Sequence, residues 1–225
     1  MCLKPAVMTD VVMAVSVGNE TLVSWSFVAV PPREVAGYIR HVRSRVAQPV
    51  TVNDNWEPFA AAVGEPVQKV WTQIDYASIH TYAYWDAGFN FWPFRQADAQ
   101  TTMAEAYRYA QKNFRDVRTA LDAAGLDIPI AIGETGWQNL PSATLAEAEE
   151  QDFATVLAGP QRQKMYYEHM QTWAYGAGGD DPGDGHLRPA AMFYFAAFDE
   201  PWKEADDNWG LWDAERKRKP VLGGD

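Results

Sequence analysis

Residues 130–139 read IAIGETGWQN, an apolar run that leads directly to a glutamate. The first three residues of this run have the composition of a strand that leaves water. Glu134 would be costly to bury without a partner, so its place at the mouth of the strand indicates a use for a carboxylate there. Gly133 and Gly136 flank the acid and are expected to keep the backbone permissive at this point.

Four other short apolar segments are predicted to be strands, and most read as the near-continuous runs that are typical of strands buried on both faces. With 128–133, the predicted strands are 11–17, 49–53, 74–79 and 190–198. Helical patterns between them cover about 31–46, 98–124 and 161–175. Strands and helices in repeated alternation predict an α/β fold with a parallel sheet.

The composition is that of an ordinary globular chain. Its 225 residues suit one domain with a sizeable core, and its net charge of −11 argues against a nucleic acid or an anionic membrane as partner. The basic run at 216–219 is interpreted as a solvated turn. Cys2 is the only cysteine, so no intramolecular disulfide forms, and no apolar run approaches the roughly 20 residues of a membrane span.

Two features leave alternatives open. Ten Trp, ten Tyr and ten Phe suit a sugar-stacking site, but a packed core could hold the same residues. The loop at 176–189 carries Asp180, Asp181 and Asp184, which could bind calcium. The EF-hand spacing is absent, so a solvated acidic loop is the preferred interpretation.

Charged residues, most of them acidic, follow three of the predicted strands. Glu20 follows the first, Glu134 the fourth, and Asp199, Glu200 and Lys203 the fifth. In parallel α/β folds the carboxyl ends of the strands meet at one edge, so the two glutamates are expected to converge there. Paired carboxylates fit glycosidic cleavage, one as acid and the other as nucleophile or base. A single strand-end glutamate is more often a cap neighbour or a salt-bridge partner, and it is the pair that favours chemistry.

Four motifs carry a resemblance to a known family: VSVGNE (15–20), IGETGW (132–137), FAAFDEPWK (195–203) and NWGLWD (208–213). Together and in this order they resemble glycoside hydrolase family 17, the β-1,3-glucanases, and look most like its bacterial branch. The resemblance implies a partial (β/α)8 TIM barrel made of strands four to eight, with 1–225 as a single catalytic domain. It therefore also implies an N-terminally truncated chain, the C-terminal five-eighths of a barrel.

The resemblance also assigns roles by position. Glu20 would be the general acid/base and Glu134 the nucleophile of a retaining mechanism. The matching substrate-binding positions are Asn19 (toward the sugar 2-hydroxyl), Tyr82 (beside the nucleophile), the pair Glu200 and Lys203, and the cleft aromatics Trp137 and Trp209. No metal or organic cofactor is implied.

Several further residues have two interpretations each. His80 could touch substrate, although a strand-end histidine is more often structural. Trp85, Trp92 and Phe94 could form sugar platforms or a packed loop, and Asn53 and Trp56 lie at the expected mouth for substrate contact. Trp25 and Trp173 are expected to be core or helix-packing residues.

The implied activity is hydrolysis of β-1,3-glucan, with a transglycosylase or a non-catalytic glucan-binding fragment as alternatives. An ester hydrolase is disfavoured because no G-x-S-x-G elbow occurs. The family implies a secreted, periplasmic or cell-envelope protein, although residues 1–10 lack the form of a signal peptide. The unclosed edge of the partial barrel predicts self-association.

Overall fold

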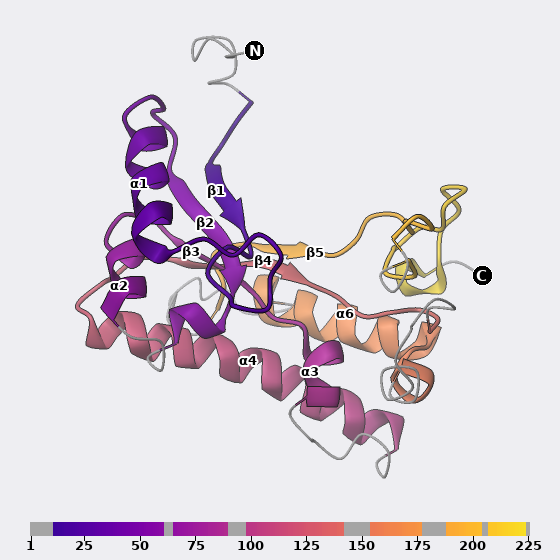
Figure 1. The fold of residues 1–225 in the computed structure, drawn as a ribbon. Coiled ribbons are helices and arrows are strands. Elements are labelled where there is room, and N and C mark those ends of the chain that lie inside the picture. Colours follow the sequence, from indigo (N-terminus) through magenta and orange to yellow (C-terminus); the bar gives the residue numbers. More distant parts are fainter. Residues whose placement is uncertain are drawn as a thin grey trace. The chain divides into compact units, whose positions relative to one another are not determined.

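The computed structural model of the protein describes residues 11–60, 65–89, 98–141, 154–176, 188–203 and 207–223. The acidic positions of the 176–189 loop, Trp92 and Phe94 lie outside these residues, so the interpretations of them stay predictions. Strands and helices alternate along the chain (Figure 1). The elements are β1 (Val15–Asn19), α1 (Pro32–Arg43), β2 (Val50–Asn55), η2 (Glu57–Phe59), α2 (Glu65–Trp71), β3 (Ala77–His80), α3 (Ala83–Phe89), α4 (Ala99–Ala123), β4 (Ile130–Thr135), α6 (Pro160–Tyr175), β5 (Met192–Tyr194) and η4 (Pro220–Leu222).

The five strands form one sheet in the order β1-β2-β3-β4-β5. β1 pairs with β2 and β2 with β3 in parallel, with Val15 opposite Val50 and Asn53 opposite Ser78. Adjacent strands in sequence are thus neighbours in the sheet, each joined by a crossover that contains a helix. This confirms the predicted α/β fold with a parallel sheet.

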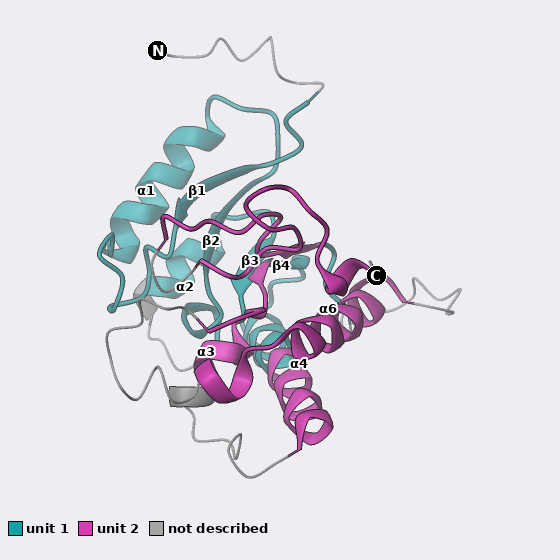
Figure 2. Ribbon diagram, turned by 90° about the vertical axis from the view of Figure 1, so that its right-hand side faces the viewer, with its two compact units in different colours: residues 1–81, 113–133, 183–191 teal, residues 82–112, 134–182, 192–225 magenta. Residues whose placement is uncertain are grey.

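The chain divides into two compact units, which Figure 2 colours separately. Unit 1 comprises residues 1–81, 113–133 and 183–191, and unit 2 comprises 82–112, 134–182 and 192–225. The chain passes from unit 1 to unit 2 after Thr81 and again after Gly133, within β4. The two units are described separately below, and a single catalytic domain over 1–225 stays a prediction.

Unit 1 has an aliphatic core between α1, the strands and the second half of α4. Its fully or nearly fully buried members include Val35, Ile39, Val50, Val52, Ile79, Val117, Leu121, Ile130 and Ile132. Each such side chain contributes roughly 1.5–3 kcal/mol of burial free energy. The helix α1 starts at Pro32 and ends with Arg40, His41 and Arg43 in its last turn, where basic groups complement the helix dipole.

Unit 2 has an aromatic core. Tyr84, Trp137, Tyr166 and Trp209 are at most 1% exposed. The buried amide of Gln163 on α6 donates hydrogen bonds to the carbonyls of Trp137, Trp209 and Gly210. Several of the aromatic residues that the composition singles out therefore build a core in this unit.

Of two expectations about exposure, the structure confirms that most of the strands are buried and corrects the solvated basic turn in part. β2, β3 and β4 are largely buried, but β1 is partly exposed along its length and Phe193 of β5 is 63% exposed. Both strands lie at the ends of the strand order, where a strand has a neighbour on one side only. In the basic run, Lys219 is buried and pairs with Asp199 at 2.6 Å, so the run is not uniformly solvated.

Among the residues that the structure describes, no helix is long and apolar enough to cross a membrane. The longest of these helices, α4, is too polar.

Candidate active site

Glu20 follows β1 in unit 1 on a strained turn. Its φ is +50°, in the left-handed region that a non-glycine residue seldom adopts. Its backbone N–H donates to the carbonyl of Asn53 at 3.0 Å, which ties the turn to β2. Strain of this kind persists only where the surroundings impose it, and it is found most often at functional sites.

The partner of the Glu20 carboxylate is His80, the last residue of β3. His80 is completely buried, and its Nδ1 lies 3.2 Å from Glu20 Oε1, while the Glu20 side chain keeps 30% of its exposure. The carbonyl of His80 accepts the N–H of Trp56, which joins the ends of β2 and β3. Within unit 1 the potential metal ligands at this edge are Glu20 and His80, which contact one another.

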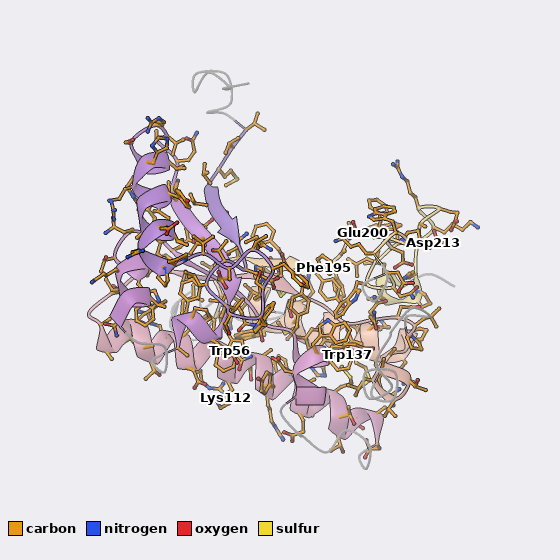
Figure 3. All side chains as sticks on the ribbon, viewed as in Figure 1. Trp56, Lys112, Trp137, Phe195, Glu200 and Asp213 are labelled. Atoms are coloured by element: carbon orange, nitrogen blue, oxygen red, sulfur yellow. The ribbon has the colours of Figure 1, made fainter. Side chains whose placement is uncertain are left out.

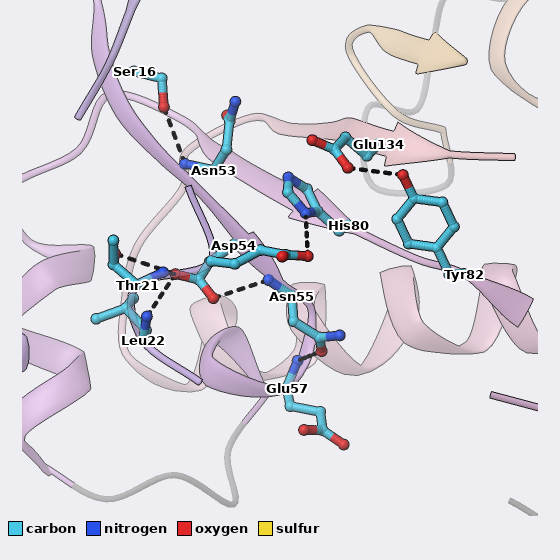
Figure 4. A network of polar contacts seen from close by, with 11 residues as sticks. Ser16, Thr21, Leu22, Asn53, Asp54, Asn55, Glu57, His80, Tyr82 and Glu134 are labelled. Carbon is cyan, nitrogen blue, oxygen red and sulfur yellow. Dashed lines mark hydrogen bonds and ion pairs between the residues drawn. The ribbon is translucent and has the colours of Figure 1, made fainter. Parts of the chain in front are cut away.

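Asp54 on β2 holds the turn that carries Glu20 (Figure 4). Its Oδ2 accepts the backbone N–H groups of Thr21 and Leu22, both at 2.8 Å, and its Oδ1 accepts the N–H of Asn55 at 3.0 Å. Burial raises the pKa of Asp54 to about 6, although the three backbone N–H groups favour the charged form. The buried carboxylate of Asp54 therefore accepts hydrogen bonds from the backbone that directly follows Glu20.

Gly133 brings β4 against the end of β3 within unit 1. A Cβ at Gly133 would lie 2.5 Å from Ser78 Oγ and 3.3 Å from the His80 ring. The predicted reason for this glycine, a permissive backbone, is therefore wrong. The close approach of β3 to β4 leaves no room for a side chain at the residue before Glu134.

Glu134 begins the unit 2 part of β4, and its carboxylate has a fixed donor. Tyr82 Oη donates to Glu134 Oε2 at 2.7 Å (Figure 4). The Tyr82 ring packs edge-on against Trp209 and Phe195, with centroids 5.5 and 6.1 Å away. A phenol held by two aromatic neighbours can keep its hydroxyl aimed at one carboxylate oxygen.

Gly136 is also explained by packing. A Cβ there would lie 2.1 Å from the Phe195 carbonyl oxygen and 2.9 Å from the Trp209 ring. The Phe195 N–H donates to the Thr135 carbonyl at 2.7 Å, so the backbone after β5 lies directly on the end of β4.

The structure buries both predicted cleft aromatics. Trp137 is 0% exposed and donates its indole N–H to the Leu157 carbonyl, and Trp209 is 1% exposed. Trp209 contacts the rings of Tyr82, Tyr84 and Phe195, so one of its neighbours is the donor to Glu134.

The basic and acidic pair after β5 is formed. Lys203 Nζ lies 2.7 Å from Glu200 Oε2 and 4.8 Å from the centroid of the Phe195 ring. Figure 3 labels Phe195, Glu200 and Trp137 on the unit 2 chain. Next to this pair, Asp199 accepts hydrogen bonds from Gly210 N–H and Lys219 Nζ, which fix the segment against the turn at 208–213.

The remaining predicted residues fall into two groups. Asn19 is exposed at the end of β1, and Asn53, Trp56 and Trp85 are partly exposed. Trp173 is 7% exposed, as predicted for a packing residue, but Trp25 is 57% exposed, so its prediction as a core residue is wrong. Trp25 lies on the long turn after Glu20, which is closed by a hydrogen bond from Val30 N–H to the Thr21 carbonyl. Val23 of this turn is buried, but Trp25 is not.

The profile of the BtgE/BtgC glycoside hydrolase domain matches residues 2–215 of the chain. The chain belongs to this family. The predicted relationship to the family 17 glycoside hydrolases is thereby confirmed at the level of a glycoside hydrolase domain.

This BtgE/BtgC domain is 26% identical to a glucan 1,3-beta-glucosidase of Arthroderma benhamiae over 93% of the chain and 61% of that protein. Its fold resembles an endo-laminarinase from Formosa Hel1_33_131, with a TM-score of 0.78 and 24% identity over 96% of the chain and 58% of that structure. The fold also resembles a glycoside hydrolase family 17 beta-1,3-glucanosyltransferase from Rhizomucor miehei, with a TM-score of 0.59 and 21% identity over 93% of the chain and 63% of that structure. The domain therefore has an α/β fold that forms part of a TIM barrel and spans about three-fifths of the lengths of these relatives.

One contributor to this site, Asp54, is missed by the sequence interpretation. His80 is named there, but its contact with Glu20 is not predicted. The sequence does carry a weak signal, since three consecutive polar residues, Asn53 to Asn55, end an otherwise apolar strand. Such a run at the carboxyl end of a parallel strand is where functional groups gather.

Proposed function

We propose that this domain cleaves β-1,3-glucan by a retaining double displacement, with Glu134 as nucleophile and Glu20 as general acid/base. The family membership supports a glycoside hydrolase, and the relatives, named as a glucan 1,3-beta-glucosidase and an endo-laminarinase, support the substrate class.

One observation carries the assignment of the two glutamates. Each carboxylate has its own fixed partner, His80 for Glu20 and Tyr82 for Glu134, and the two partners are separated by a single residue of the chain. Within unit 1, Gly133 lies against His80, and Glu134 is the next residue. Chain connectivity alone therefore supports the view that both carboxylates serve one reaction centre.

The reaction follows from these roles. The Glu134 carboxylate attacks the anomeric carbon while Glu20 gives its proton to the departing glycosidic oxygen, so the C–O bond breaks and a glycosyl ester forms on Glu134. The Glu20 carboxylate then removes a proton from water, whose oxygen attacks the same carbon and releases Glu134. Tyr82 donates to the nucleophile, which holds it in one rotamer before attack.

The test is the release of reducing sugar from laminarin by the wild type and by Glu134→Gln and Glu20→Gln. We expect Glu134→Gln to abolish activity and Glu20→Gln to lose roughly 10²–10⁴-fold, the usual contribution of a general acid. The matched control is Glu168→Gln, an exposed glutamate of α6 that pairs with Lys164. Wild-type rates in Glu134→Gln would contradict the proposal.

The stereochemistry and the acceptor are tested in the same reaction. Proton NMR of the first product should show the β anomer, because two displacements retain configuration. An initial α anomer would exclude the covalent intermediate. Products longer than the starting oligosaccharide would show that a sugar hydroxyl takes the place of water.

A further inference from the structure

Asp54 is a buried acidic group that the reaction described above does not use. It is 0% exposed, and it accepts hydrogen bonds from the backbone N–H groups of Thr21, Leu22 and Asn55 and from the Thr21 hydroxyl. Burial raises its pKa to about 6, so keeping this carboxylate ionised in neutral solution costs stability. The carboxylate therefore calls for another physical explanation.

The donors that it binds belong to one segment. Thr21 and Leu22 are the two residues directly after Glu20, and both of their N–H groups point to the same oxygen, Oδ2, at 2.8 Å. Bonds from N–H to an ionised oxygen are shorter and about twice as strong as bonds between neutral groups. Asp54 thus binds the turn at Thr21 and Leu22, while the Asn53 carbonyl accepts the N–H of Glu20 itself.

The backbone at Glu20 needs such a clamp. With φ at +50°, Glu20 occupies a strained region of backbone conformation, and the turn would relax if its other bonds were weakened. Relaxation would rotate the Glu20 side chain away from His80 Nδ1, which now lies 3.2 Å from Oε1.

We infer that Asp54 is a positioning residue that acts through Glu20: its carboxylate holds the 20–22 turn in the strained form that presents the Glu20 carboxyl beside His80. This inference rests on the proposed function, since it assigns Asp54 to the acid/base half of that mechanism. It predicts a defect specific to proton transfer to the leaving group.

The test compares two substrates on one enzyme preparation. A laminari-oligosaccharide has a sugar leaving group that needs protonation, whereas a 2,4-dinitrophenyl β-laminaribioside releases a phenolate that does not. We expect Asp54→Asn to lower kcat/KM by roughly 10- to 100-fold on the oligosaccharide, as a misplacement of about 1 Å can do, and by less than about 3-fold on the aryl glycoside. The ratio of the two values does not depend on the fraction of enzyme that is folded.

The matched control is Asp75→Asn. Asp75 also accepts a backbone N–H, from Val50 at 2.7 Å, and pairs with Arg43, but it lies at the opposite ends of β2 and β3. Its substitution should leave the ratio unchanged. Glu20→Gln should shift the ratio in the same direction as Asp54→Asn, and further.

The outcomes separate the two proposals. If Asp54→Asn lowers kcat/KM by the same factor on both substrates, the ratio is unchanged. Asp54 would then be a purely structural residue, and the inference would be overturned. If Glu134→Gln keeps wild-type activity on the aryl glycoside, it is the proposed function that fails. An Asp54→Asn ratio that follows Glu20→Gln, with Glu134→Gln inactive on both substrates, supports both.

Discussion

At the scale of single residues, each candidate carboxylate is set by one contact with a buried or packed partner. Tyr82 donates to Glu134 at 2.7 Å, and the Tyr82 ring is itself held by Trp209 and Phe195. The phenol thus holds in place the carboxylate that must attack the anomeric carbon. Its hydroxyl can be removed without changing the packing of the ring.

The first prediction concerns this hydroxyl. Tyr82→Phe should lower kcat/KM on laminarin roughly 10- to 100-fold, because a hydrogen bond to a charged group contributes about 1.5–3 kcal/mol. Steady-state kinetics measure the loss. The control is Tyr107→Phe on α4, which removes a hydroxyl bonded to the Gln111 amide and should change kcat/KM by less than 2-fold, about 0.4 kcal/mol. Equal rates for Tyr82→Phe and wild type would contradict the role of this contact.

At the scale of elements, the ends of the strands meet closely enough to exclude side chains. Gly136, directly after β4, packs against the Phe195 carbonyl. The sequence GETG (133–136) indicates only a turn and does not reveal this contact. The positions of the long helices followed from periodicity: α4 and α6 agree with the predicted ranges to within one or two residues. The strands agree less closely, since β5 spans only Met192–Tyr194 of the predicted 190–198. The short helix α3 was not predicted, because its seven residues, AYWDAGF, include too little apolar periodicity to distinguish a helix from a loop.

The second prediction tests the close approach at Gly136. Gly136→Ala places a Cβ 2.1 Å from the Phe195 carbonyl oxygen, so it should lower the free energy of unfolding by about 1–3 kcal/mol or more. Urea denaturation measures the change. Gly37→Ala in α1 is the matched control, since its Cβ would lie 3.9 Å from Arg40 Nη2 and alanine favours a helix by about 0.5–1 kcal/mol. A neutral Gly136→Ala would show that the β4 turn can shift.

At the scale of the whole molecule, a few buried ionisable groups make stability depend on pH. Burial raises the pKa of Asp54 from 3.8 to about 6. Unfolding then releases a proton at pH values between these two numbers, so the contribution of Asp54 is fully present below about pH 4 and is lost as the pH rises through 6. This rise in the pKa of Asp54 corresponds to a change of roughly 3 kcal/mol in the free energy of unfolding.

The third prediction follows from this linkage. Between pH 4 and pH 7 the wild type should lose up to about 3 kcal/mol of unfolding free energy relative to Asp54→Asn, which does not titrate. Urea denaturation at four pH values in this range measures both proteins. Asp75 should show the opposite pH dependence. Burial raises its pKa, but Arg43 and the Val50 N–H outweigh burial, so the net pKa is lowered. The loss of unfolding free energy in Asp75→Asn should therefore disappear as the pH falls. Parallel pH curves for wild type and Asp54→Asn would contradict the prediction.

The fourth prediction concerns association of whole chains. β1 pairs with β2 alone among the described strands, and Val11 and Met13 before it are 75% and 87% exposed. An edge strand of this kind is a template for pairing, and lysine on it prevents pairing. Sedimentation velocity should show concentration-dependent association that Val11→Lys/Met13→Lys weakens and Tyr38→Lys on α1 does not. A wild type that stays monomeric at every concentration would contradict it.

The sequence by itself determined the α/β class, the order of five strands and the placement of Glu20 and Glu134 at strand ends, because hydrophobic periodicity is a local property that needs no partner. Only the tertiary structure decided what each of these residues meets. It assigned His80 and Asp54 to the Glu20 turn, packed Trp137 and Trp209 into a core, and made Gly133 and Gly136 necessary through close backbone approach. These contacts join residues up to 73 positions apart, as in Gly136 and Trp209, and no local pattern specifies which distant segment will arrive.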